Sequence, residues 1–334
     1  MRFVIVTALL FAVVAVLSAV LTRVAISYLR RRAMVDRPND RSSHTVPTLR
    51  GGGLGLMAAL LPVWIWITAQ AGRLGDPSQL LLIVGAAALM AISWLDDRRG
   101  LGPAPRFFTQ IAVIAAVMAF LPPTLSLSGG LLPLSLDRLI AGLLWAWFVN
   151  LFNFMDGIDG IAGGSAAAMA VGLTLVALWR GPDQLEAVRS AMIAAAALGF
   201  LAWNWHPAKV FLGDVGSVPL GFLLGYELIR LAMDAGQPMA LIIPLYYLAD
   251  ATLTLIRRAL RGERVWRAHR EHFYQRAVQN GRGHAQVARV AMRVQLGLAV
   301  LALLAVRLGW WMAVPAVLLV TWLLLWMAKP ARTA

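Results

Sequence analysis

The chain has 334 residues, of which 60% are hydrophobic and only 14% are charged, against roughly 25% charged residues in soluble domains. Its mean hydropathy of +0.72 and its repeated apolar runs exclude an ordinary soluble protein. The absence of Cys excludes a disulfide framework and a thiolate metal site. The net charge of +14 comes from basic residues in short loops, which favours anionic lipids and phosphorylated substrates over nucleic acid.

The apolar stretches predict eleven membrane-spanning helices, with ten as the alternative. Residues 3–22 are expected to form an uncleaved first span rather than a signal peptide. Further spans are expected near 51–71, 77–95, 107–122, 138–154, 161–180, 187–203, 218–234, 238–258, 286–306 and 309–327. We therefore predict a single all-α transmembrane helical bundle over residues 1–334, without a soluble domain.

Polar and basic residues gather in five loops, and each consecutive pair of loops is separated by two predicted spans. All five should therefore emerge on one side, near 30–53, 94–106, 153–160, 204–217 and 257–285. Their excess of Lys and Arg predicts a cytoplasmic location, with the N-terminus in the periplasm and the C-terminus in the cytoplasm. Ionisable groups at one membrane face favour an enzyme over a transporter, which keeps such groups near the bilayer midplane.

The stretch from 150 to 160 carries a polar side chain at every third position. Steps of three drift by about 60° each on an ideal helix, so the four side chains converge only if the helix tightens or ends. Gly157 and Gly160 favour an ending, in a loop that holds a cation or a phosphate. The alternative is ordinary helix capping. The polar residues are Asn150, Asn153, Asp156 and Asp159.

Further acids stand at two other span ends. Asp96 and Asp97 close the span at 77–95, either with one carboxylate acting as a metal ligand or base or as a solvated helix end. Asp214 lies between two glycines and is a hard oxygen ligand suited to Mg²⁺. Phe211 offers a flat face to a nucleobase, although a lipid-facing Phe is equally consistent with its position.

Two loops contain candidate phosphate ligands. His269, Arg270 and His272 favour phosphate binding over zinc, because no third zinc ligand lies nearby in the sequence. The first loop contains His44, Thr48 and the glycine run 51–55. These glycines either expose helix N-terminal amides to a phosphate or permit close helix packing.

Within the span at 238–258, Asp250 lies on the same helix face as Arg257, seven residues further on. We expect the two side chains to form a buried ion pair.

Taken together, the motifs resemble the polyprenyl-phosphate N-acetylhexosamine-1-phosphate transferase superfamily, which includes the MraY and WecA types. The resemblance covers residues 36–276 in the expected order. It rests on Asp96-Asp97, the 150–160 stretch, the 204–217 stretch, Asp250 and the pair His269 and His272. It implies transfer of a sugar-1-phosphate from a UDP-sugar to a polyprenyl phosphate, with release of UMP and a need for Mg²⁺, for which Mn²⁺ substitutes.

The resemblance also implies roles for individual residues. Asp214 and Asn153 would hold the metal ion, and Phe211 would stack on uracil. Asp96 or Asp97 would deprotonate or position the lipid phosphate. Asp156 and Asp159 complete the catalytic candidates, with Asp159 and Asn204 in the nucleotide pocket. The remaining substrate-binding candidates are His44, Thr48, Asn150, Lys209, His269, Arg270 and His272.

Two departures from the MraY pattern narrow the resemblance. The last loop has His269-Arg-Glu-His272 in place of consecutive histidines, and His44 stands where MraY relatives have Lys. Both favour a WecA-type enzyme of the bacterial inner membrane that starts O-antigen or a related surface polysaccharide on undecaprenyl phosphate. GlcNAc and 6-deoxy sugars such as FucNAc and QuiNAc remain open as donors. The alternatives are the phospho-MurNAc-pentapeptide transferase reaction and a lipid-linked sugar transporter. The oligomeric state is open, a homodimer included.

Overall fold

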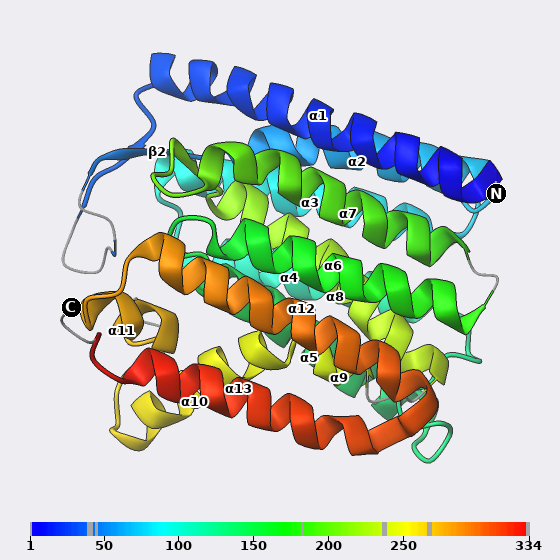
Figure 1. Ribbon diagram of the computed structural model, residues 1–334. Coiled ribbons are helices and arrows are strands. Elements are labelled where there is room, and N and C mark those ends of the chain that lie inside the picture. The colour runs from blue at the N-terminus through cyan, green and yellow to red at the C-terminus, as the bar shows by residue number, and fades with distance from the viewer. Residues whose placement is uncertain are drawn as a thin grey trace.

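The computed structural model describes residues 2–38, 43, 46–181, 184–235, 239–265 and 269–331. Within these ranges, long helices run side by side as an elongated bundle (Figure 1). The helices are α1 (Arg2–Arg31), α2 (Gly53–Gln70), α3 (Pro77–Arg99), α4 (Pro103–Phe120), α5 (Leu134–Phe154), α6 (Ile161–Arg180), α7 (Gln184–Asn204), α8 (Asp214–Ala235), α9 (Met239–Ile242), α10 (Leu245–Leu260), α11 (Phe273–Gln279), α12 (His284–Leu308), the 3₁₀ helix η1 (Gly309–Met312) and α13 (Ala313–Ala328).

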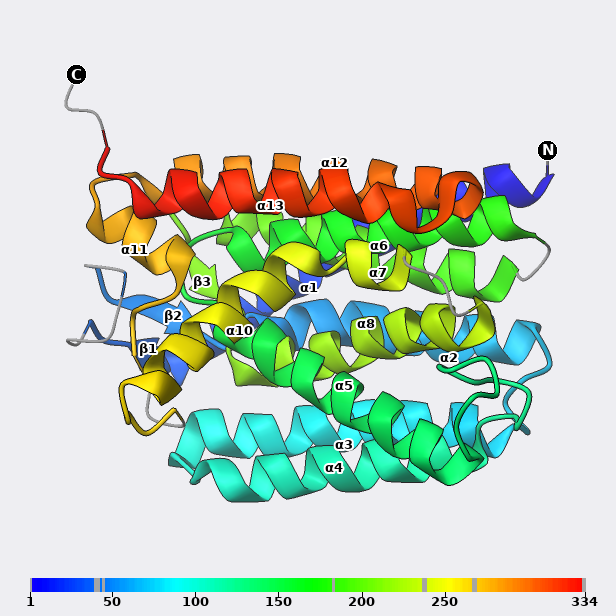
Figure 2. The same cartoon turned by 90° about the horizontal axis from the view of Figure 1, so that it is seen from below.

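Eight helical stretches in the described residues are long and apolar enough to cross a membrane, so the chain is a multi-pass membrane protein. By this measure the expectation of eleven spans is too high. The apolar helix Ala104–Phe120 is too short, and the stretch after 238 is divided into α9 and α10 at Pro244. The two last predicted spans, 286–306 and 309–327, correspond to α12 and α13, which count as one stretch by this measure, His284–Ala328, but fold back on each other at η1 (Figure 2).

Burial separates central helices from peripheral ones. In the most apolar stretch of α8, 89% of the residues are buried, against 11% in the corresponding stretch of α1. The exposed face of α1 carries Val4, Leu9, Val13 and Val20. Exposed aliphatic side chains are stable in contact with lipid, so α1 is a peripheral helix and α8 a central one.

The glycine run at the start of α2 serves helix packing. A Cβ atom on Gly53 would lie 2.2 Å from the Cα atom of Gly216 in α8, and one on Gly55 would lie 2.4 Å from the Cα atom of Thr22 in α1. The backbone N–H groups of residues 51–53 donate to the carbonyl oxygens of Phe211 and Leu212. Of the two explanations predicted for this run, close packing is the correct one, because these amides already have partners.

A small sheet is the exception to the all-α prediction. It joins β1 (Val35–Asp36), β2 (Thr48–Arg50) and β3 (Val210–Phe211) in that order, first antiparallel and then parallel. Leu49 pairs with Val35 on one side and with Val210 on the other. The sheet therefore fastens the first polar loop to the loop that precedes α8.

The five polar loops meet at one end of the bundle, where Asn153 donates to Asp214 and the Tyr274 hydroxyl donates to the Phe154 carbonyl. Arg50, Asp97, Arg106 and Asp214 come from four separate segments and are linked by ion pairs. Figure 1 shows β2, α11 and the C-terminal end together at the left and the N-terminal end at the right. The side of the membrane on which this end lies stays a prediction.

Candidate active site

The acidic and amide side chains of the site lie at the ends of three helices. α3 presents Asp96 and Asp97 in its last turn, α5 presents Asn153, and α8 begins at Asp214. α5 stops at Phe154, and Gly160, with φ of 75°, precedes α6, so the predicted helix ending is confirmed. We call Asp96, Asp97, Asn153, Asp156 and Asp214, together with Arg50 and Arg106, the acidic centre.

Asp214 lies at the middle of the acidic centre. Its Oδ1 atom is 3.0 Å from Nη2 of Arg50 and accepts a hydrogen bond of 3.3 Å from Nδ2 of Asn153. Its Oδ2 atom contacts the guanidinium of Arg106. The side chains of Asp214 and Asn153, predicted as metal ligands from separate motifs, are therefore neighbours.

The same two arginines bind the paired acids of α3. Nε of Arg50 lies 2.9 Å from Oδ1 of Asp97, and Nη1 of Arg106 lies 3.0 Å from Oδ2 of Asp96. The backbone N–H of Val215 donates to Oδ2 of Asp97 over 3.1 Å. Asp97 is buried and Asp96 more open, so the two adjacent acids have different environments.

Asp156 follows α5 and is protonated more readily than an ordinary aspartate. Burial raises the pKa of Asp156 to about 8, Arg50 opposes this increase, and the nearby Asp97 carboxylate adds to it. A carboxyl group with a pKa near neutrality can gain or lose a proton at working pH, which is what a general acid or base requires.

A polar cavity of about 510 Å³ opens beside the acidic centre. Three arginines, Arg32, Arg50 and Arg98, line it together with Asp36 and Asp97. Arginine is well suited to phosphate because its planar guanidinium donates two parallel hydrogen bonds. The cavity can therefore hold a phosphorylated ligand against the acids.

Asp159, the last acid of the 150–160 stretch, belongs to a different group. Its Oδ2 atom is 2.7 Å from Nδ1 of His206 and accepts a hydrogen bond of 3.1 Å from the backbone N–H of Ala208. Its Oδ1 atom is 3.2 Å from Nδ1 of His284. Burial alone would raise the pKa of Asp159, but these hydrogen bonds outweigh it and lower the pKa to about 2.

Ligand atoms of Asp159, His206 and His284 lie within 4.8 Å of one another, so this histidine group could hold a metal ion. Its donors are mainly imidazole nitrogens, which suit zinc and similar metals. The acidic centre instead offers carboxylate and amide oxygens, the ligands that Mg²⁺ prefers. The residues of the acidic centre therefore fit Mg²⁺ better than those of the histidine group do.

The loop before α11 forms a third cluster, around the buried Asp250. This carboxylate accepts hydrogen bonds from the backbone N–H groups of Phe273 and Tyr274, over 2.9 and 3.2 Å, and lies 3.3 Å from Nδ1 of His272. The predicted ion pair with Arg257 is wrong. Arg257 lies over the ring of Phe273 instead, 4.7 Å from its centroid.

His269 lies beside His272, with ring centroids 4.8 Å apart. Burial, the neighbouring His272 and Arg258 lower the pKa of His269 to about 4. His269 is therefore neutral at pH 7 and would act on a phosphate as a hydrogen-bond donor rather than as a cation.

Several predicted binding residues have structural partners. Asn204 is buried, accepts a hydrogen bond from Gly160 N–H and donates one to the Val210 carbonyl. Asn150 donates to the Ala146 carbonyl in its own helix, and Thr48 donates to the Val46 carbonyl. Lys209 lies over the Trp203 ring. Arg270 is exposed, Phe211 belongs to β3, and His44 lies outside the described residues.

Four residues of these groups are missing from the predicted site: Arg50, Arg106, His206 and His284. Arg50 and Arg106 were assigned only to the basic loops, because an arginine at a span end is explained by topology alone. His284 is a single polar residue at the start of an apolar helix, 125 positions after Asp159. No spacing rule connects residues so far apart, so only the fold could identify it.

Comparison with known proteins agrees with this geometry. The profile of Glycosyl transferase family 4 matches residues 79–232. A decaprenyl-phosphate N-acetylglucosaminephosphotransferase of Mycobacterium tuberculosis is 30% identical over 83% of this chain and 78% of its own length. A probable undecaprenyl-phosphate N-acetylglucosaminyl 1-phosphate transferase of Bacillus subtilis is 27% identical over 81% and 76%. A phospho-N-acetylmuramoyl-pentapeptide-transferase of Rippkaea orientalis is 31% identical over 64% and 63%. The chain therefore belongs to glycosyl transferase family 4, the superfamily of MraY- and WecA-type polyprenyl-phosphate sugar-1-phosphate transferases.

Proposed function

We propose that this enzyme transfers an N-acetylhexosamine-1-phosphate from a UDP-sugar to undecaprenyl phosphate at the cytoplasmic face of a bacterial inner membrane. The proposal rests on the acidic centre, which places oxygen ligands for a divalent cation next to an arginine-lined cavity. The similarity to two N-acetylglucosamine-phosphate transferases supports the same class of donor. The product would start O-antigen or a related surface polysaccharide.

In the reaction, an oxygen of the lipid phosphate forms a bond to the phosphorus that carries the sugar. The bond from that phosphorus to the oxygen of UMP breaks, and UMP leaves with the bonding electrons. Asp214 and Asn153 would hold Mg²⁺, which neutralises charge on the diphosphate when bound. Arg50 and Arg106, which here neutralise the acids, would turn toward the phosphates of the donor.

We assign deprotonation and positioning of the acceptor phosphate to Asp96, Asp97 and Asp156. Asp96 is the more accessible of the pair, whereas Asp97 is held by Arg50 and the Val215 amide. We assign Asp96 to contact the lipid phosphate and Asp97 to position Arg50. Asp156, with its pKa of about 8, would accept the proton released when the acceptor phosphate ionises.

The reaction is tested by incubating the purified protein with undecaprenyl phosphate, Mg²⁺ and a panel of UDP-sugars. We expect UMP release with UDP-GlcNAc or a 6-deoxy N-acetylhexosamine donor, and its loss when EDTA removes the metal. Lipid-linked sugar movement across vesicles without UMP release would contradict the proposal and indicate a transporter.

The second candidate is the phospho-MurNAc-pentapeptide transferase reaction. It is favoured by the 31% identity to an enzyme of that name, although this match covers a smaller part of the chain than the first. UMP release only with UDP-MurNAc-pentapeptide would establish this alternative.

A further inference from the structure

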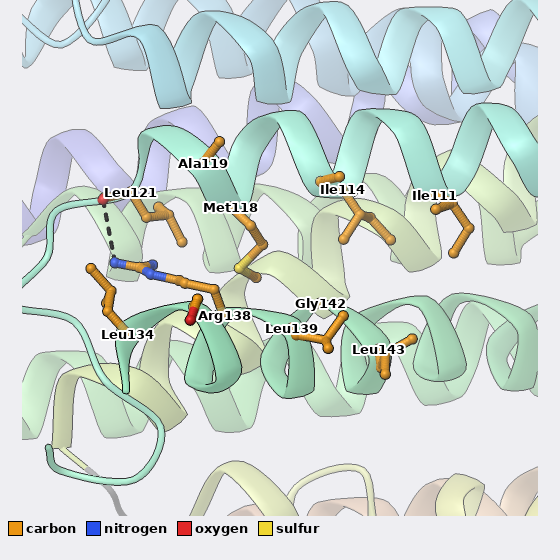
Figure 3. Close-up of a pocket in the computed structure, with 12 residues that line it drawn as sticks. Ile111, Ile114, Met118, Ala119, Leu121, Leu134, Arg138, Leu139, Gly142 and Leu143 are labelled. Carbon is orange, nitrogen blue, oxygen red and sulfur yellow. Dashed lines mark hydrogen bonds between the residues drawn. The ribbon is translucent and has the colours of Figure 1, made fainter. Parts of the chain in front are cut away.

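An apolar pocket lies in the half of the bundle away from the acidic centre. It has a volume of about 490 Å³ and is formed by the last turns of α4 and the first turns of α5 (Figure 3). Ile114, Met118, Leu139 and Leu143 are among its lining residues, and Arg138 stands at one end. Leu139 and Leu143 are also more than half exposed at the outer surface. The pocket is therefore open to the lipid around the bundle.

Among the described residues that line this pocket, Arg138 is the only charged one. Its Nη2 atom donates to the carbonyl oxygens of Leu121 and Pro122, over 3.3 and 2.5 Å. Its Nη1 atom is buried and has no hydrogen-bond partner among the described residues. The guanidinium of Arg138 therefore holds the loop after α4 with Nη2 alone and leaves Nη1 without a partner among the described residues.

The neighbouring acid, Asp137, attracts Arg138 through its charge but forms no ion pair with it in the described part of the chain. Asp137 turns the other way and accepts hydrogen bonds from the backbone N–H groups of Leu127 and Ser128 and from the Ser126 hydroxyl. Within the described part of the chain, no ion pair to Arg138 is found. A guanidinium left with an unused donor at the edge of a membrane is costly unless an anion can approach it.

We propose that this pocket binds a membrane lipid with an anionic phosphate headgroup, in the leaflet at the end of the bundle opposite the acidic centre. One hydrocarbon chain lies between α4 and α5, and the headgroup phosphate accepts hydrogen bonds from Arg138. Arg138 is half-buried as a residue and lines the pocket, so a small rotation of its side chain would bring Nη1 to the phosphate. The pocket volume is in the range of roughly 300–1,000 Å³ typical of small-molecule sites.

The test is native mass spectrometry of the full-length protein with phosphatidylglycerol or phosphatidylcholine of identical chains. We expect the protein to retain phosphatidylglycerol about tenfold more strongly, the value of one charge-assisted hydrogen bond. Arg138→Gln keeps a donor for the two carbonyls and should abolish this preference. Arg307→Gln, which removes a charge from the end of α12, should leave it unchanged.

Gly142→Leu provides a second test that leaves Arg138 in place. A Cβ atom at position 142 would make only ordinary contacts of 3.5 and 3.7 Å with Ile114 and Met118, so the larger side chain fills the pocket without disturbing the backbone. We expect this variant to lose both lipids while its melting temperature is retained.

Three results would overturn the proposal. The first is an unchanged lipid preference in Arg138→Gln, and the second is displacement of the lipid by inorganic phosphate alone. The third is a dimer without bound lipid that dissociates in Gly142→Leu, which would make this face an interface between two copies of the chain.

Discussion

Individual side chains of the acidic centre are held by their neighbours rather than by their own helices. Asp214 contacts Arg50, Arg106 and Asn153, which come from three other segments. Two guanidiniums offset part of the negative charge of the three carboxylates they contact. Each of these residues can therefore be tested by a substitution that keeps its shape and changes its charge.

The first prediction at this scale concerns Asp214→Asn. Removing the carboxylate should lower Mg²⁺-dependent UMP release by about a hundredfold or more, because a metal ligand and an ion-pair partner are lost together. Asp234→Asn, near the other end of the same helix, is the matched control and should retain activity. A folded Asp214→Asn protein with full activity would remove the metal assignment.

The second residue-scale prediction uses the raised pKa of Asp156. The folded state holds a proton up to about pH 8, whereas an unfolded aspartate loses it near pH 4. The contribution of Asp156 to the free energy of unfolding is therefore fully present below pH 4 and is lost as the pH rises through 8. In metal-free protein, Asp156→Asn should raise the melting temperature more at pH 9 than at pH 5. Equal shifts at the two pH values would contradict the raised pKa.

At the scale of elements, small residues set how closely the helices approach. Gly53 and Gly216 bring α2 against α8, just where Asp214 begins α8. This packing and the strand pairing of Arg50 with Phe211 place the first loop next to the acids. The position of Arg50 therefore depends on helix packing some distance from its own side chain.

Gly53→Ala tests this dependence. A methyl group 2.2 Å from a backbone atom cannot be accommodated without moving α2, so we expect a loss of about 1–3 kcal/mol in the free energy of unfolding. Activity should fall as well, because Arg50 would shift. Gly75→Ala, where a Cβ atom meets nothing within 4 Å, is the control. Thermal unfolding in detergent measures the effect, and equal stability of the two variants would argue against the tight contact.

At the scale of the whole molecule, the bundle separates two functions along its length. The acidic centre and the histidine group lie at the end of the bundle where the C-terminus is found. The apolar pocket with Arg138 lies toward the other end. This difference between the two ends matches an enzyme that binds a soluble nucleotide sugar on one side of the membrane only. Its orientation in the membrane can be measured directly.

The natural chain has no Cys, so single cysteines can be introduced without a background. Arg264→Cys lies in an exposed loop at the acidic end, and Leu131→Cys replaces a residue that is 88% exposed near the start of α5. In intact spheroplasts, an impermeant maleimide should label position 131 and not position 264. Inside-out vesicles should give the opposite pattern, and labelling of 264 in spheroplasts would reverse the proposed topology.

By itself, the sequence determined the helical membrane bundle, the helix ending after Phe154 and the gathering of polar loops at one end. These follow from local rules, because backbone in lipid must satisfy its own hydrogen bonds and spans alternate sides. Only the tertiary structure decided that Arg50 and Arg106 join the acids, that Asp159 pairs with His206 and His284, and that Asp250 binds backbone amides rather than Arg257. These contacts join residues far apart in the chain, and packing alone sets which of many polar groups meet.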